Sequence, residues 1–134
     1  MCIRDSHISP CYEYILREET ETVYEYGQRM AQELEDEILR LGPKSVMAFM
    51  AEPVVGATLG AVPAVDGYFQ KIRKICDQYG VLLILDEVMC GMGRTGYLYA
   101  CNADNIAPDI LCICLLYTSP SPRDLSTSRM PSSA

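Results

Sequence analysis

Apolar side chains recur at intervals of three and four between residues 23 and 41, which is the period of an amphipathic helix. The apolar positions on this face are Val23, Tyr26, Met30, Leu34, Ile38 and Leu41. Gly42 and Pro43 follow directly, and a glycine followed by a proline typically ends a helix. The pattern therefore predicts one long surface helix that ends at residue 41.

A second, shorter helix is predicted between residues 66 and 79. Its apolar face consists of Phe69, Ile72, Cys76 and Tyr79. Asp66 stands where a side chain can cap the helix N-terminus, and Gly80 stands where the helix would end. Polar residues fill most of the other positions, so we expect one face to pack on a core and the other to face water.

Continuous apolar runs flank the second helix on both sides, at residues 46–51 and 81–85. Runs of this length are typical of strands buried on both faces of a parallel sheet. A third strand is expected near residues 109–113, after a short turn or helix at 98–103. The Gly- and Pro-rich residues 52–65 are predicted to form a long loop. The order strand, helix, strand predicts an α/β fold, a parallel sheet with helices on both faces.

The run at residues 81–96, VLLILDEVMCGMGRTG, carries the strongest chemical signal in the chain. Its apolar strand ends in Asp86 and Glu87, and a glycine-punctuated loop follows. In parallel α/β sheets ligands bind beyond the carboxyl ends of the strands, so an acid at that place is a candidate for ligand binding. A buried carboxylate needs a cationic partner to offset its desolvation, and Asp86 is the acid that we expect to have one.

The spacing within this run disfavours two other interpretations. Apolar residues followed by Asp-Glu also describe the magnesium-holding strand of nucleotide hydrolases, but such sites need a Gly-Lys pair, and the chain has none. Gly91, Gly93 and Gly96 match the letters of a dinucleotide fingerprint, in which the first glycine closes the strand. Here five residues separate the strand from Gly91, so a pyrophosphate would not meet a helix N-terminus at this loop.

Three segments together resemble the large domain of class III pyridoxal-phosphate aminotransferases, which are type I pyridoxal-phosphate enzymes. They are AEPVVGA at 51–57, LLILDEVMCGMGRTG at 82–96 and APDI at 107–110, in the order and spacing of that family. The resemblance implies that Asp86 pairs with the pyridine nitrogen of pyridoxal 5'-phosphate and that Val88 packs on the ring. A carboxylate beside the ring keeps the nitrogen protonated, and a protonated ring accepts electrons when the substrate Cα loses its proton.

The same resemblance assigns two further positions. Glu52 falls on the glutamate that in many relatives pairs with a substrate-gating arginine, which hints at an acceptor with two carboxylates such as 2-oxoglutarate. The alternative for Glu52 is a surface acid in an ion pair. Met89 is the third candidate cofactor contact, although the family commonly has a glutamine there that reaches the phenolic oxygen of the cofactor. Arg94 is expected either to tie the loop down or to meet a neighbouring subunit.

The lysine that forms the Schiff base in the family is missing from its place two residues after Ile113, where the chain has Leu115. Lys44, Lys71 and Lys74 are expected to face solvent. The resemblance implies a homodimeric parent enzyme that transfers an amino group between an amine or amino acid and a keto acid. The chain as it stands is expected to be inactive, and the alternative is a truncated, non-catalytic fragment without a cofactor.

Residues 1–6 and 114–134 are expected to be translated sequencing adapter, which leaves 7–113 as a partial cofactor-binding large domain. The peptides MCIRD and CLLYTS read back as nucleotide sequences that are reverse complements over most of their length. The rest of the tail is mostly Ser, Thr and Pro, which cannot bury a core and predicts disorder.

The composition of the chain disfavours several classes of binding partner and site. The formal net charge of −7, from 18 acidic and 11 basic residues, disfavours nucleic acid. No apolar run exceeds the length of a strand, so no membrane span is predicted. The seven cysteines include no C-x-x-C pair, which disfavours a metal site, and with no signal peptide they indicate a cytoplasmic protein. His7 is expected to be a surface residue and Cys90 a packing residue.

Overall fold

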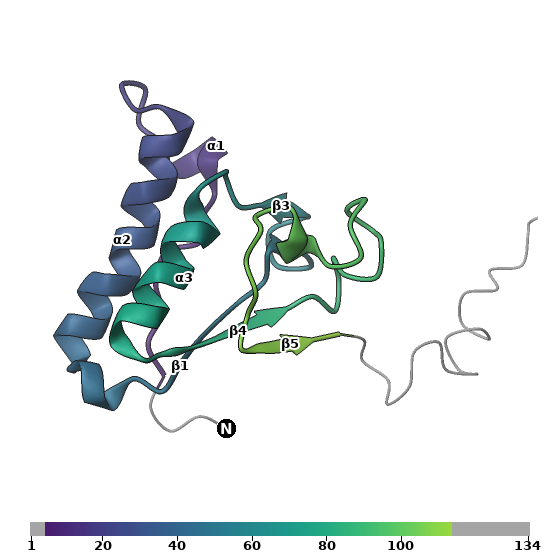
Figure 1. Ribbon diagram of the computed structural model, residues 1–134. Helices are drawn as coiled ribbons and strands as arrows, with labels where there is room; N and C mark the ends of the chain where they lie inside the picture. The colour runs from purple at the N-terminus through teal and green to yellow at the C-terminus, as the bar shows by residue number, and fades with distance from the viewer. Residues whose placement is uncertain (1–4, 114–134) are drawn as a thin grey trace, which may run out of the picture.

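A three-stranded parallel sheet forms the centre of the computed structural model, which describes residues 5–113 (Figure 1). The strands are β1 (Ala48–Ala51), β4 (Leu82–Asp86) and β5 (Ile110–Cys112), in the spatial order β1-β4-β5. β1 and β4 coincide with the predicted apolar runs and β5 lies within the third predicted strand at 109–113, so the α/β fold with a parallel sheet is confirmed. The predicted adapter residues 1–4 and 114–134 lie outside the described residues.

Two long helices lie on the same side of the sheet, α2 (Val23–Leu41) and α3 (Tyr68–Tyr79) (Figure 1). The predicted bounds of α2 are confirmed, and Gly42 ends it with a φ of 88° that favours glycine. A short helix that the sequence did not predict, α1 (Glu13–Leu16), precedes them. We predicted helices on both faces of the sheet, and residues 5–113 provide the helices of one face.

The side chains of β4 alternate between a covered and an open face of the sheet. Leu83 and Leu85 are fully buried in the hydrophobic core with residues of α2 and α3. Because successive side chains of a strand point to opposite faces, Leu82, Ile84 and Asp86 point away from these helices. Asp86 is thereby delivered to the carboxyl end of the strand on the open face, beside its register partner Cys112.

The start of α3 corrects one prediction, because Asp66 does not cap this helix. The residue before the helix is Gly67, which has a φ of 87° and makes no side-chain capping bond. A Cβ at Gly67 would lie 2.6 Å from the ring of Tyr24 in α2. The close approach of α2 therefore requires a glycine here, and Asp66 remains an exposed residue before the turn. Gly80 ends α3 in the left-handed conformation, as predicted.

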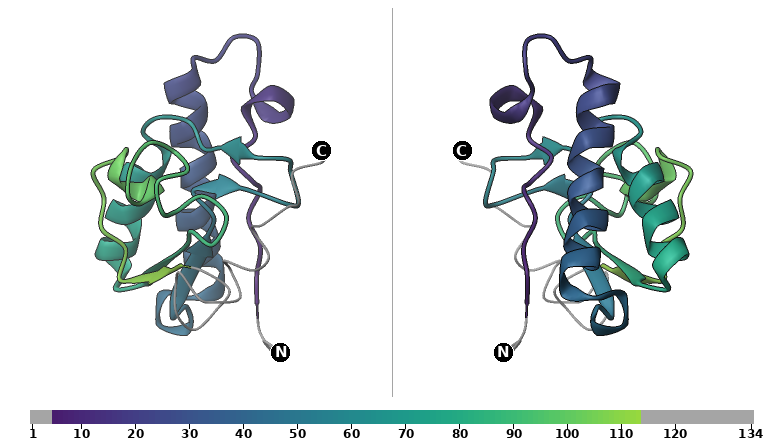
Figure 2. Two further views of the ribbon diagram at one scale, coloured as in Figure 1. Left: turned by 90° about the vertical axis from the view of Figure 1, so that its right-hand side faces the viewer. Right: turned by 90° about the vertical axis from the view of Figure 1, so that its left-hand side faces the viewer.

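The predicted long loop after β1 contains a small hairpin that the sequence did not indicate. Its strands are β2 (Val54–Val55) and β3 (Val62–Pro63), which pair antiparallel. Each strand has two residues, too few to show the alternation that identifies a strand in a sequence. Figure 2 shows the hairpin and the N-terminal segment on the same side of α2.

None of the helices within residues 5–113 combines the length and the apolar character that crossing a membrane requires. In the same residues no three side chains of His, Cys, Asp or Glu are grouped so as to hold a metal ion.

Candidate active site

Asp86 ends β4 with its carboxylate half-buried and one oxygen fixed. Oδ1 accepts a hydrogen bond of 3.0 Å from the backbone N–H of Val88, a turn that Asp side chains readily form with the amide two residues on. Within residues 5–113 no donor binds Oδ2. One oxygen therefore orients the carboxylate, while the other is free to accept a hydrogen bond from a ligand.

Met89 joins the tip of β4 to the loop after β1. Its side chain is 55% exposed, yet a Cβ added to Gly56 would lie 3.0 Å from Met89 Cγ. Gly56 in turn donates its N–H to Glu52 Oε2 at 2.9 Å. The structure thus brings Glu52 and Met89 together at Gly56, where an added Cβ would make close contact with the Met89 side chain.

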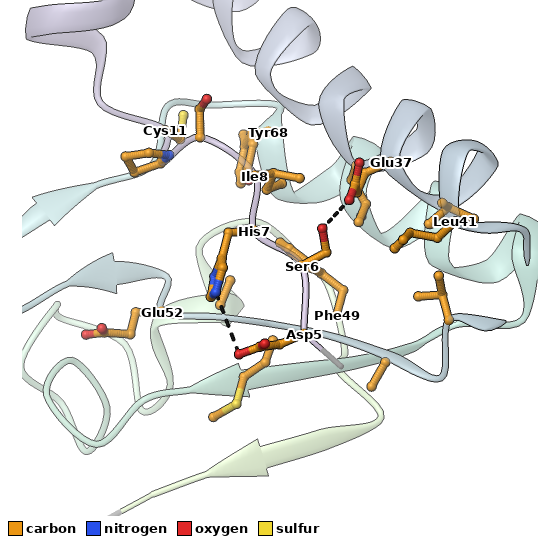
Figure 3. A pocket seen from close by; sticks show the side chains of 18 of the residues that line it. Asp5, Ser6, His7, Ile8, Cys11, Glu37, Leu41, Phe49, Glu52 and Tyr68 are labelled. Atoms are coloured by element: carbon orange, nitrogen blue, oxygen red, sulfur yellow. Dashed lines mark hydrogen bonds and ion pairs between the residues drawn. The ribbon is translucent and has the colours of Figure 1, made fainter. Parts of the chain in front are cut away.

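Glu52 follows β1 directly and lines a cavity of about 780 Å³. This cavity lies between the N-terminal segment, α2 and β1, and Figure 3 shows Glu52 at its border. Asp86, Val88 and Met89 are not among its lining residues. Ala51 lies beside Leu85 in the sheet register, so Glu52, which follows β1, and Asp86, which ends β4, lie at the same edge of the sheet. The predicted site depends on this arrangement.

His7 also borders this cavity, and it is the exposed residue that we predicted. Its Nε2 lies 3.7 Å from Asp5 Oδ2, as Figure 3 shows. The imidazole has no cysteine partner in the hydrogen bonds of the described residues.

Glu87 is the residue whose importance the sequence analysis missed. Its side chain is 1% exposed, and its two oxygens accept hydrogen bonds from the backbone of Ala100 at 2.6 Å and of Cys101 at 2.8 Å. Burial, followed by the hydrogen bond to Glu87, raises the pKa of the Cys101 thiol to about 12. Strand alternation was the available signal, because an Asp86 that faces the open side puts its neighbour on the core side.

The loop after Glu87 is held by hydrogen bonds within itself. Gly91 donates its N–H to Glu87 O at 2.8 Å, and Arg94 Nη1 donates to Gly91 O at 3.0 Å. Of the two roles predicted for Arg94, the structure thus provides the one that ties the loop down. No helix starts at Gly96, in keeping with the rejection of the dinucleotide fingerprint.

Cys90 is buried in this loop, and burial raises the pKa of its thiol. A raised pKa keeps the thiol protonated and therefore a poor nucleophile. The predicted packing role of Cys90 is confirmed by its burial.

One lysine prediction is wrong. Lys71 is half-buried, and its ammonium donates to Gln28 O at 2.9 Å and to Gln32 Oε1 at 2.8 Å. It lies where α3 packs on α2, so polar groups of α2 take the place of solvent. Lys44 and Lys74 are exposed, as predicted.

A family model described as Aminotransferase class-III matches residues 6–119 of the chain. This match covers most of the 134 residues and includes every candidate site residue. The chain belongs to the class-III aminotransferase family. The match extends six residues past the predicted boundary at Ile113, and the boundaries at 7 and 113 stay predictions.

Aminotransferases from several organisms are similar to this chain. An uncharacterized aminotransferase of Schizosaccharomyces pombe is 55% identical over 108 residues, which cover 81% of this chain and 24% of that protein. Gamma aminobutyrate transaminase 3, chloroplastic, of Solanum lycopersicum is 44% identical over 93 residues, which cover 69% and 18%. A thermostable omega transaminase mutant from Pseudomonas jessenii matches in structure with a TM-score of 0.77 and 37% identity, over 81% and 24%. The chain therefore spans at most about a quarter of the length of these relatives.

Proposed function

We propose that the protein containing these residues is a pyridoxal-phosphate-dependent transaminase. It transfers an amino group between an amine or amino acid and a keto acid. One observation carries this proposal: Asp86 stands at the carboxyl end of β4 with Oδ1 held by Val88 and no donor on Oδ2 among residues 5–113. The class-III aminotransferase match supports the same reaction class.

The residues around Asp86 fit pyridoxal phosphate in their chemistry. An ionised carboxylate accepts hydrogen bonds only, so Asp86 suits a ring nitrogen that carries a proton. Val88 offers an aliphatic side chain two residues on, which suits contact with a flat ring. When bound, pyridoxal phosphate supplies an electron sink for the substrate Cα, and the charge of Asp86 retains the proton on the ring nitrogen.

Glu52 and Met89 are assigned different parts of the same site. Glu52 keeps its position through the N–H of Gly56, so its carboxylate is oriented to pair with a cationic group. We assign it the pairing with a gating arginine elsewhere in the whole protein, which favours an acceptor with two carboxylates. Met89 is assigned a packing contact at the cofactor site, because a thioether cannot donate a hydrogen bond to a phenolic oxygen.

The proposal extends to the lysine and the subunits of the whole protein. The chain has Leu115 in the place of the lysine that forms the Schiff base in the family, so the 134-residue chain alone is proposed to be inactive. Lys71 is engaged by α2 and is not assigned a covalent role. The whole protein is proposed to be a homodimer. The cytosol is its proposed compartment, since the five cysteines of the described residues are all free.

The test is an amino-transfer assay of the full-length protein with pyridoxal phosphate, a panel of amino donors and keto acids, and two variants. Asp86→Asn keeps the shape of the side chain and removes its charge. A loss of about 3 to 5 kcal/mol of transition-state stabilisation would slow the half-reaction roughly a hundred- to several thousand-fold. Asp66→Asn changes an exposed acid and should stay within about twofold of wild type. The proposal would be contradicted if no pair of amino donor and keto acid gave amino transfer, or if Asp86→Asn reacted at the same rate as wild type.

A further inference from the structure

Glu87 is a fully buried carboxylate that has no cationic partner within residues 5–113. Its side chain is 1% exposed, and no Lys, Arg or His within residues 5–113 approaches it closely enough for an ion pair. A buried charge is unfavourable unless hydrogen bonds or opposite charges replace its lost water. The groups that solvate Glu87 therefore show what this residue holds in place.

Those groups belong to the short 3-10 helix Ala100–Asn102, which follows the loop at residues 88–99. The backbone N–H groups of Ala100 and Cys101 each donate to a different oxygen of Glu87, at 2.6 and 2.8 Å. The Cys101 thiol, whose pKa is raised to about 12, stays protonated beside the same carboxylate. One side chain at the start of the loop thus fixes the backbone at its end.

The near end of the loop is packed against Glu87 as closely as the chain allows. A Cβ at Gly91 would lie 3.1 Å from Glu87 Cβ and 3.2 Å from Glu87 Oε2. The N–H of Glu87 donates to Cys112 O at 2.8 Å, which ties the same residue to the end of β5. Glu87 is consequently held on three sides, by β5, by the turn at Gly91 and by residues 100 and 101.

Asp86 and Val88 are the immediate neighbours of this fixed point. The hydrogen bond from Val88 N to Asp86 Oδ1 spans Glu87, so the carboxylate of Asp86 can keep its orientation only while the backbone of Glu87 stays in place. The two acids face opposite sides of the sheet. Glu87 therefore acts on the site through the backbone.

We infer that Glu87 is a positioning residue: its buried carboxylate closes the loop 88–99 onto residues 100 and 101 and thereby orients Asp86 and Val88 for the cofactor. The part of this inference that concerns catalysis rests on the proposed transaminase function. The part that concerns the loop does not, because it can be measured without cofactor.

The first measurement is residue-resolved hydrogen–deuterium exchange of the full-length apoprotein and its Glu87→Gln variant. Glutamine has the same shape, but one of its two polar atoms is an NH₂ group that cannot accept from a backbone N–H. Exchange should become about ten- to a hundredfold faster at whichever of Ala100 and Cys101 faces the NH₂ group, which is the usual effect of losing a hydrogen bond to a charged group. The other amide keeps a bond to the neutral amide oxygen, which is weaker, and should exchange faster by a smaller factor. Exchange at Val88 should accelerate with them, by at least about fivefold.

Kinetics of the holoenzyme provide the second measurement. If Glu87 orients Asp86, kcat of the Glu87→Gln enzyme should fall about tenfold or more while KM stays within about twofold. Glu19→Gln, a change at an exposed acid, should alter neither exchange nor kcat. A further outcome is that the full-length protein shows no transaminase activity while Glu87→Gln still accelerates exchange at both Ala100 and Val88. That result would contradict the proposed function but support the role of Glu87 in positioning the loop.

Two results would overturn the inference. If exchange becomes faster at Ala100 and Cys101 but not at Val88, Glu87 holds residues 100 and 101 in place without orienting Asp86. If exchange is unchanged at all three residues, Glu87 does not hold the end of the loop either. If Glu87→Gln does not fold, the wild-type protein in low denaturant decides the question. The amides of residues 88, 100 and 101 should then open together with one free energy, and independent opening of Val88 would contradict us.

Discussion

At the scale of single residues, the proposed site is built around two adjacent acids with opposite surroundings. Asp86 faces the open side of the sheet with one oxygen free among the described residues, while Glu87 faces the core with both oxygens bonded to backbone N–H groups. Asp86 could be singled out from its place at a strand end. The contacts of Glu87 could not, because Ala100 and Cys101 lie 13 and 14 residues away and their backbone groups leave no signature in the sequence.

Gly91 is predicted to be intolerant of any side chain. In Gly91→Ala the new Cβ would meet Glu87 O at 2.8 Å, an atom of the backbone that cannot rotate away. Overpacking of this kind costs about 1–3 kcal/mol, so the midpoint of chemical unfolding of the full-length protein should fall. Thr95→Ala, at an exposed position of the same loop, is the control and should leave the midpoint nearly unchanged. Equal midpoints for the two variants would show that the loop yields to the added methyl group.

At the scale of elements, α2 and α3 were predictable because each is long enough to display the helical period, and β1 and β4 because each lies in a continuous apolar run. The hairpin of β2 and β3 and the start of α3 were not. The hairpin strands have two residues each, and at Gly67 it is the contact with Tyr24 of another helix that leaves no space for a Cβ. The sequence pattern thus identifies the longer helices and strands, whereas the start of α3 depends on a contact with another helix.

The start of β5 is expected to make stability depend on pH. Asp109 accepts a hydrogen bond of 2.7 Å from Leu83 N and one of 2.8 Å from Arg73, and these bonds lower the pKa of its carboxyl. A pKa lower in the folded than in the unfolded state contributes stability above about pH 4. That contribution is lost as the pH falls through the folded-state value.

The measurement is the unfolding midpoint of the full-length protein between about pH 6 and pH 3. Asp109→Asn should lower the midpoint at pH 6 and flatten its dependence on pH. Asp77→Asn is the matched control, since Asp77 pairs with the same Arg73 at 2.8 Å but bonds no strand. If Asp109→Asn keeps the full pH dependence of wild type, Asp109 is not the group responsible.

At the scale of the whole molecule, β1 leaves apolar surface uncovered in the described part of the chain. Within residues 5–113 it pairs with β4 alone, and Met50 on β1 is 57% exposed. Unpaired strand edges with apolar side chains promote association. We therefore expect the isolated 134-residue chain to associate, and light scattering after size exclusion would detect this.

A matched pair of variants locates the associating surface. Met50→Lys should shift the isolated chain toward monomer, whereas Leu39→Lys should not, although Leu39 on α2 is 54% exposed and as accessible as Met50. A monomeric wild-type chain with a sharp cooperative melt would contradict the expectation.

We propose that Asp86 keeps the pyridine nitrogen of the cofactor protonated, and nitrogen NMR measures this protonation directly. The full-length holoenzyme would be prepared with pyridoxal phosphate labelled with ¹⁵N in the ring, and its spectrum recorded near neutral pH. We predict the chemical shift of a protonated nitrogen in wild type and of an unprotonated nitrogen in Asp86→Asn, with wild-type behaviour in Asp66→Asn. An unprotonated nitrogen in wild type, or the same protonated signal in Asp86→Asn, would contradict the role assigned to Asp86.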